Sequence, residues 1–211
     1  SRFAFNSYFG RINYSYLDKY LLTFTGRVDG SSKFGKNNKY AFFPSAALAW
    51  RVSDEDFLKD NAVISNLKLR TSYGVTGNSE IPPYTSLPLL SSGYAAIFNN
   101  QRVGGTGLGL LSNPDLRWEK TAQTDAGLEL GLFKGRISLE ADVYYRKTTD
   151  MFGPQETLPY TLGTGTPVAN NASLSTKGFE LVLDWNDRVG SAFSYNVQLS
   201  VGDSKSKILK Y

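Results

Sequence analysis

Apolar and polar side chains alternate one by one over long stretches of this 211-residue sequence. Near the start, Tyr8, Ile12 and Tyr14 alternate with Arg11 and Asn13. Successive side chains of a β-strand point to opposite faces, so a period of two is the signature of a strand with two different faces. The pattern predicts strands that are apolar on one face and polar on the other.

The same alternation recurs in about eight segments, near residues 8–16, 20–28, 42–52, 67–76, 118–132, 137–146, 179–185 and 193–201. Most segments approach or exceed the roughly 9–11 residues with which a tilted strand crosses a membrane. A soluble β-sandwich also alternates, but its strands are typically about 5–6 residues long. The lengths therefore favour an all-β fold in which antiparallel strands form a transmembrane β-barrel segment.

The connections between these segments alternate between short and long. Tight turns are predicted near Asp18, Lys134 and Asp187-Arg188, and long loops at Gly30–Ala41, Asn78–Arg117 and Thr149–Thr176. Outer-membrane barrels show this asymmetry, with short periplasmic turns and longer outer loops. Ser53–Ser65 lies on the short-turn side, and Ser53 followed by Asp56 predicts one short helix or ordered turn there.

Large aromatic residues gather near the ends of the predicted strands. Five lie near the short-turn ends and two near the long-loop ends: Tyr16, Tyr20, Trp50, Trp185 and Tyr195, and then Trp118 and Tyr145. Trp and Tyr are enriched where a membrane meets water. The placement predicts two aromatic belts on the apolar face.

The composition excludes several classes of function. The chain has no Cys and no His, so disulfides, Cys or His metal sites and His-dependent catalytic triads are excluded. The neighbouring carboxylates of Asp54, Glu55 and Asp56 fit a helix start better than an acid–base pair. The net charge of +4 is scattered, which disfavours nucleic-acid binding. We therefore predict no enzyme, with no catalytic, cofactor-binding or metal-binding residue.

Charged and amide side chains occupy the polar positions of the predicted strands. In a wet barrel interior such groups are expected to be solvated or to pair with one another. The predicted interior residues are Arg27, Asp29, Lys68, Arg70, Glu119, Gln123, Asp125, Glu129, Glu140, Asp142, Glu180, Asp184, Asn196 and Gln198.

The long loops hold the candidate substrate contacts. Aromatic rings could stack on sugars and amides could bind hydroxyl groups, although the same residues could equally pack the loops together. The candidates are Tyr84, Tyr94, Phe98, Asn99, Asn100 and Tyr160. The run Gly104–Gly109 lacks the context of a phosphate-binding loop and predicts a flexible loop.

Several ordered motifs resemble one known family. They are RVDGSSKFG (Arg27–Gly35), FFPSAALAW (Phe42–Trp50), SDEDF (Ser53–Phe57), NLKLRTSYGVTGN (Asn66–Asn78), NPDLRWEKT (Asn113–Thr121), DVYYRKTTDM (Asp142–Met151) and KGFEL (Lys177–Leu181). Their order and spacing resemble the barrel of the SusC/RagA family of TonB-linked outer-membrane transporters. Leu174-Ser175-Thr176 departs from the Asn- or Gly-rich lead-in that the family usually has before KGFEL.

The resemblance implies a barrel of about 22 strands with an N-terminal plug. Members import large nutrients such as glycans or peptides across the outer membrane. The TonB complex supplies energy through a TonB box near the N-terminus, and a SusD-like surface lipoprotein caps the barrel. Residues 1–211 would then be part of the barrel, embedded in the lipid bilayer, with the plug and the TonB box outside this chain.

One alternative remains open, a complete small outer-membrane barrel of eight strands with a structural or adhesive role. In that case the terminal strands, near Ser7–Leu17 and Phe193–Val201, pair with each other. In a transporter segment they pair with strands outside this sequence, because lipid cannot satisfy open backbone groups.

Overall fold

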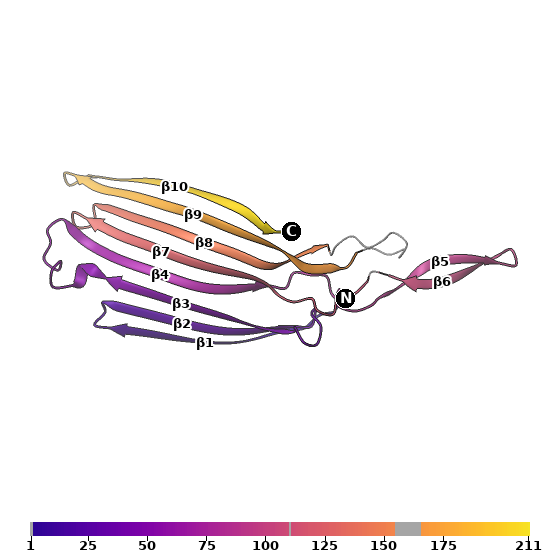
Figure 1. The fold of residues 1–211 in the computed structure, drawn as a ribbon. Coiled ribbons are helices and arrows are strands. Elements are labelled where there is room, and N and C mark those ends of the chain that lie inside the picture. Colours follow the sequence, from indigo (N-terminus) through magenta and orange to yellow (C-terminus); the bar gives the residue numbers. More distant parts are fainter. Residues whose placement is uncertain (1, 110, 155–165) are drawn as a thin grey trace.

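The computed structural model describes residues 2–109, 111–154 and 166–211. Eight strands form one antiparallel sheet in the order β1-β2-β3-β4-β7-β8-β9-β10, and β5 and β6 form a separate two-stranded sheet (Figure 1). The bounds are β1 (Phe5–Tyr16), β2 (Tyr20–Ser31), β3 (Tyr40–Arg51), β4 (Ile64–Asn78), β5 (Leu90–Phe98), β6 (Gln101–Leu108), β7 (Glu119–Leu132), β8 (Ile137–Pro154), β9 (Val168–Val189) and β10 (Phe193–Lys210). The predicted all-β, antiparallel sheet of about eight strands is confirmed.

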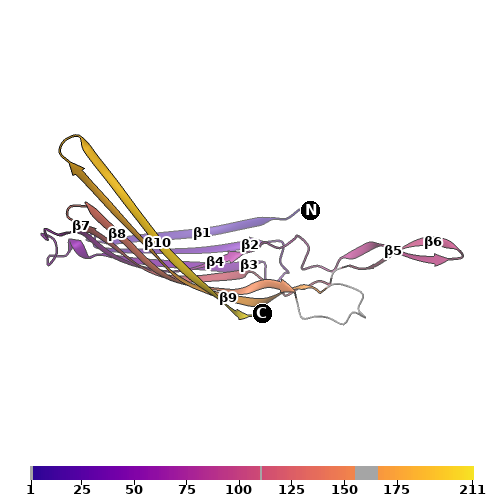
Figure 2. The ribbon, with the colours of Figure 1, turned by 90° about the horizontal axis from the view of Figure 1, so that it is seen from above.

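The large sheet is a single curved layer that does not close on itself (Figures 1 and 2). Among the described strands, β1 pairs only with β2, and β10 pairs only with β9. The two edge strands therefore do not pair with each other. This arrangement contradicts the complete small barrel and agrees with a segment of a larger one.

The tight turns lie together at one end of the sheet (Figure 1). Leu17 and Asp18 join β1 to β2 with φ values of 52° and 53°, and Phe133 and Lys134 join β7 to β8 with 54° and 59°. Pairs of left-handed residues are typical of hairpin turns whose twist matches that of the strands. We call this end of the sheet the turn end.

Two predictions at the turn end need correction. The turn between β9 and β10 follows Val189, whereas Asp187-Arg188 still belong to the ladder of paired strands. Ser53 lies inside a 3-10 helix, η1 (Val52–Asp54), instead of capping a helix; its hydroxyl bonds the Asp54 carboxylate. The expected short ordered element after β3 is thus present as η1 followed by turns.

The opposite end, here the outer end, carries the long connections and the projecting β5–β6 hairpin (Figures 1 and 2). The sequence predicted a loop throughout Asn78–Arg117, but this hairpin occupies its middle. Gly104, Gly105 and Gly107 belong to β6 and not to a flexible loop. A Cβ at Gly107 would lie 2.7 Å from a ring carbon of Tyr94, so this glycine lets the ring pack across the hairpin.

The strand register places side chains of one kind in rows across the sheet. One row runs through Leu69, Leu128, Ala141, Leu181 and Val201. The adjacent row, on the other face, contains Arg70, Gly127, Asp142, Glu180 and Gly202. The predicted division into an apolar face and a polar face is therefore confirmed.

A single layer leaves little to bury, and the hydrophobic core is small. Five buried residues form one cluster at the outer end: Phe34, Phe43, Ile81, Leu116 and Trp118. We call this the mouth cluster. None of the helices in the described ranges is long and apolar enough to cross a membrane.

Candidate functional site: the polar face and its outer end

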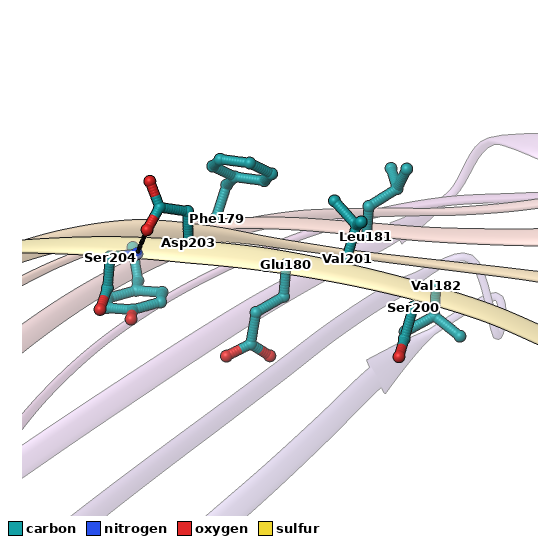
Figure 3. Close-up of a pocket in the computed structure, with 10 residues that line it drawn as sticks. Phe179, Glu180, Leu181, Val182, Ser200, Val201, Asp203 and Ser204 are labelled. Atoms are coloured by element: carbon teal, nitrogen blue, oxygen red, sulfur yellow. Dashed lines mark hydrogen bonds between the residues drawn. The ribbon is translucent and has the colours of Figure 1, made fainter.

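The two faces of the sheet differ sharply at β9 and β10. Figure 3 shows Phe179, Leu181 and Val201 on one side, and Glu180 and Val182 on the other. Leu181 is 38% exposed and Val201 is 61% exposed, although both are large apolar residues. An extended surface of this kind requires an apolar environment or a partner.

Charged residues on the polar face of three neighbouring strands form an ion-pair ladder. Lys68 Nζ of β4 lies 3.0 Å from Glu129 Oε1 of β7. Arg70 Nη2 of β4 lies 2.6 Å from Asp142 Oδ2 of β8, and its Nε lies 3.4 Å from Glu129 Oε1 without hydrogen-bond geometry. The pairing predicted for these charges is therefore present. Because the side chains stay partly exposed, each pair contributes little stability by itself.

Amide and hydroxyl groups extend this ladder toward the outer end. Asp125 accepts hydrogen bonds from Ser72 Oγ at 3.0 Å and from Gln123 Nε2 at 2.7 Å. Gln123 Oε1 in turn accepts one from Arg146 Nε at 2.8 Å. Nearer the turn end, Gln198 Nε2 donates to Asp184 at 3.4 Å. The polar face thus carries local networks of paired groups and not a set of isolated charges.

Three predicted interior residues stand apart from this network. Within the described part of the chain, Glu119, Glu140 and Glu180 have no ion-pair or side-chain hydrogen-bond partner. No group of three or more His, Cys, Asp and Glu side chains in that part is arranged to hold a metal ion. These carboxylates therefore add negative charge to the polar face without forming a metal site.

The mouth cluster fastens the outer connections to the sheet. The Trp118 ring lies 5.2 Å from that of Phe34, in the β2–β3 connection, and 5.5 Å from that of Phe43, in β3. Trp118 Nε1 donates to the carbonyl of Lys39 at 3.1 Å. Ile81 comes from the segment that follows β4. Three connecting segments are therefore anchored on one side of the sheet.

The position of Trp118 contradicts its predicted place in an aromatic belt on the apolar face. It precedes the first residue of β7, is 3% exposed and packs against Phe43. The alternation of β7 does not extend beyond Glu119, so it cannot orient this side chain. The other predicted outer-end aromatic, Tyr145, lies on the apolar face and is 49% exposed. Trp185, at the turn end of the same face, is 47% exposed.

A hollow of about 640 Å³ lies beside the mouth cluster, and we call it the mouth pocket. Arg27 Nε pairs with Asp29 Oδ1 at 2.7 Å, and Asp29 is only 7% exposed. Lys33 Nζ donates to the Ser79 carbonyl at 3.3 Å. The remaining lining includes Phe5, Phe43, Asn78, Glu80 and Trp118. Charges of both signs therefore meet aromatic surface in one place.

Close packing of Phe43 at this pocket depends on a glycine. A Cβ at Gly77 of β4 would lie 2.1 Å from Phe43 Cζ. Sequence reasoning did not find the mouth pocket, because its residues come from separate connections and strands. One signal was available, since Phe42-Phe43 breaks the alternation and places an aromatic ring on the polar face.

The predicted substrate contacts do not gather at the mouth pocket. Tyr94 and Phe98 lie on β5, and Asn99 and Asn100 form the hairpin turn with φ values of 48° and 61°. Tyr84 lies in the connection between β4 and β5 with a φ of 71°. Tyr160 lies outside the described residues. The asparagines thus have a conformational reason to be where they are, because Asn tolerates the left-handed region.

A carboxylate clamp closes the turn end between β2 and β3. Glu55 accepts hydrogen bonds from the Tyr20 hydroxyl at 2.7 Å and from Trp50 Nε1 at 3.0 Å. Lys19 Nζ adds a third at 3.0 Å. These hydrogen bonds, with that of Tyr20 first among them, lower the pKa of Glu55 to about 2. The clamp ties the segment after β3 to the neighbouring hairpin.

Comparisons with known proteins agree on one family. The family model described as "TonB dependent receptor-like, beta-barrel" matches residues 1–208. TonB-dependent receptor P3 of Formosa agariphila is 43% identical over 204 residues, which are 97% of this chain and 20% of that protein. TonB-dependent receptor SusC of Bacteroides thetaiotaomicron is 37% identical over 207 residues, covering 97% of this chain and 21% of SusC.

A solved structure supports the same relationship. The RagAB peptide importer in the "open-open" state superposes with a TM-score of 0.89 at 31% identity, covering 99% of this chain and 22% of that one. The chain thus spans about a fifth of the length of the relatives it matches. With a matching family model along nearly its whole length, the chain belongs to the TonB-dependent receptor-like β-barrel family and is of the SusC/RagA type.

Proposed function

We propose that this chain forms part of the wall of an outer-membrane transporter that imports a large nutrient. The observation that carries the proposal is the open eight-stranded sheet with one exposed apolar face and one charged face. Its relationship to SusC and RagAB supports the same role. In the proposed arrangement the apolar face contacts lipid and the polar face lines the lumen.

The ion-pair ladder supports this orientation. Lys68, Arg70, Glu129 and Asp142 would be costly to place in hydrocarbon but are stable beside water. The tight turns would then lie in the periplasm and the long connections outside the cell. The mouth pocket would consequently face the external entrance of the lumen.

The remaining parts of the transporter would come from outside these 211 residues. Sheet edges in lipid must be paired, so β1 and β10 would bond to further strands of the same barrel. A plug and the contact with the TonB complex would likewise lie elsewhere in the full-length protein. This chain would contribute wall, mouth and outer surface, and no catalytic residue.

The substrate is proposed to be an oligosaccharide or an oligopeptide. Charges of both signs beside aromatic surface in the mouth pocket suit either, because peptide termini can pair with charges and sugar rings can pack on aromatic groups. Tyr84, Tyr94, Phe98, Asn99 and Asn100, together with Tyr160, remain proposed contacts at the outer surface.

A SusD-like lipoprotein is proposed to dock on the β5–β6 hairpin. The hairpin exposes Leu90 and Ile97 at 75% each, and Phe98 at 66%. An isolated two-stranded hairpin is only marginally stable in water, so exposed apolar residues on one favour a partner. Its position beyond the outer end of the sheet suits a lid above the lumen (Figure 2).

The test is a deletion in the full-length protein of a bacterium that depends on it. The N–H of Gly109 bonds the Leu89 carbonyl at 2.9 Å, so residues 90–108 can be replaced by a short Gly-Ser turn. The residues of the mouth cluster, including Ile81, lie outside the deleted segment and are retained. We expect the variant to insert normally, to lose capture of the lipoprotein, and to lose growth on one polymeric nutrient class while growing normally on its monomers.

Panels of glycans and of peptides identify the substrate class. The matched control inserts the same Gly-Ser turn at Lys134-Gly135, at the turn end, and is expected to grow normally. Unchanged growth on every polymeric nutrient, with the deletion protein correctly inserted, would count against a role in uptake.

A further inference from the structure

Four lysines gather on the apolar face near its outer end. Lys147 lies on β8, Lys177 on β9, and Lys205 and Lys207 on β10. Lys177 pairs directly with Lys205, and Ser175 of β9 pairs with both Lys147 and Lys207. The four side chains thus occupy two adjacent rows on the same face of three neighbouring strands. We call them the lysine group.

The charges of the lysine group are not balanced by the protein. All four residues are exposed, and none has an ion-pair partner among the residues that the structure describes. Asp203 shares this face (Figure 3), and its carboxylate accepts a hydrogen bond from the Ser204 amide at 2.8 Å. These four ammonium groups and this carboxylate sum to +3, and the exposed Lys120 of β7, two residues before the Lys147 partner Ala122, adds a further positive charge on the same face. Like charges directly opposite one another destabilise a sheet, so this arrangement favours an external anion.

The level of these lysines on the sheet indicates which anion. Tyr145, 49% exposed, pairs with Lys177 and so lies at the level of the lysine group. The next row toward the turn end on this face holds Val143, Phe179 and Asp203, of which Phe179 is 45% exposed. Beyond that row lies the apolar row of Leu69, Leu128, Ala141, Leu181 and Val201. Aromatic residues above an apolar band mark the boundary between hydrocarbon and headgroups. Under the proposed orientation, the lysine group lies at the headgroups of the outer leaflet.

We infer that the lysine group binds the phosphate groups of an anionic lipid in the outer leaflet. The acyl chains of that lipid would lie along Phe179, Leu181 and Val201, and its phosphates would contact the ammonium groups. Ammonium–phosphate contacts combine charge attraction with hydrogen bonding. The inference rests on the proposed membrane orientation, but it does not depend on which nutrient is imported.

The experiment measures lipid binding to the purified full-length protein in a zwitterionic detergent. The probe is a diphosphorylated lipid A, compared with the same lipid after removal of its phosphates, and bound lipid is counted by native mass spectrometry. Each lysine near an anionic lipid surface strengthens binding about fivefold, so Lys177→Gln/Lys205→Gln should weaken binding about 30-fold. Lys59→Gln/Lys134→Gln removes the same charge at the turn end and should bind as the wild type does.

The double variant should remain folded, because it removes two opposed like charges from an exposed surface. If it does not fold, Lys147→Gln offers a second route, with an expected loss of about fivefold. Lipid binding by Lys177→Gln/Lys205→Gln, or by Lys147→Gln, that equals that of the wild type would overturn the inference. Equal binding of the dephosphorylated lipid, or displacement of the lipid by inorganic phosphate alone, would also overturn it.

Failure of this inference can be told apart from failure of the proposed function. Lipid binding is measured on purified protein and requires no transport, whereas the growth test requires no particular lipid. A variant that loses the lipid but still supports growth would confirm the lipid site and leave import intact.

Discussion

Leu181 and Val182 provide a direct test of which face meets lipid. They are neighbours on β9 and lie at the same depth on opposite faces (Figure 3). Leu181 pairs with Ala141 and Val201, on the apolar face. Val182 projects from the polar face, on the same side as Glu180. We therefore compare Leu181→Arg with Val182→Arg in the full-length protein.

The depth of this pair follows from the strand geometry. Leu181 lies four residues from Trp185 toward the turn end and four from Lys177 toward the outer end. At about 3.4 Å per residue and a tilt of about 40°, each of these four-residue stretches spans about 10 Å along the membrane normal. Leu181 is therefore close to the centre of an apolar band about 25 Å high.

An arginine at that depth on the lipid face costs about 2–4 kcal/mol. Leu181→Arg should therefore reduce the folding equilibrium constant by roughly 30-fold to 900-fold. Val182→Arg should cost less than about 1 kcal/mol, because its guanidinium would enter a polar surface with Glu140 opposite and Glu180 nearby.

The assay is urea unfolding of both variants in phospholipid vesicles, followed by the shift in gel mobility between folded and unfolded barrel. Equal destabilisation by the two arginines, or greater damage from Val182→Arg, would show that the faces are assigned the wrong way round.

Three further predictions concern the ends of the sheet. Because the pKa of Glu55 falls from 4.5 to about 2 on folding, its stabilising contribution is complete above about pH 5 and is lost as the pH falls toward 2. Glu55→Gln should therefore flatten the curve of unfolding free energy against pH between these values. An unchanged slope in that range would contradict the clamp. Gly77→Ala places a Cβ 2.1 Å from a ring carbon of the mouth cluster and should cost about 1–3 kcal/mol, whereas Gly10→Ala, with no atom within 4 Å, should be nearly neutral in the same urea titration. An epitope inserted at Asn99-Asn100 should bind antibody on intact cells and one at Lys134-Gly135 should not; surface labelling of the second would overturn the topology.

Much of the large sheet could be predicted from the sequence because the polarity of each strand side chain matches the face on which it lies. Leu181 is apolar and points to the apolar face, whereas its neighbour Glu180 is charged and points to the polar face. The ion pair between Arg70 and Asp142 also followed from their shared face, although the partner could not be chosen without the register. Alternation thus identifies faces, while pairing requires the neighbouring strand.

The outer end could not be predicted in the same way. Gly104, Gly105 and Gly107 carry no side chain to reveal a face, so β6 resembled a flexible loop. Trp118 and Phe43 meet only after several connections have converged, and that contact is a tertiary property. Local pattern therefore failed where burial comes from distant segments and not from one side of a strand.

The left-handed turns also bear on the order in which the strands assemble. Leu17 and Phe133 adopt φ values of 52° and 54° without being glycine or asparagine, a conformation that costs each roughly 1–2 kcal/mol. Such turns do not hold a hairpin closed by themselves. The β7–β8 hairpin is flanked by ladders with β4 and β9, and the β1–β2 hairpin by a ladder with β3, so each would be secured only when a neighbouring strand is already in place. Assembly of this wall would then proceed by templated addition, with an existing edge selecting the register of the next hairpin.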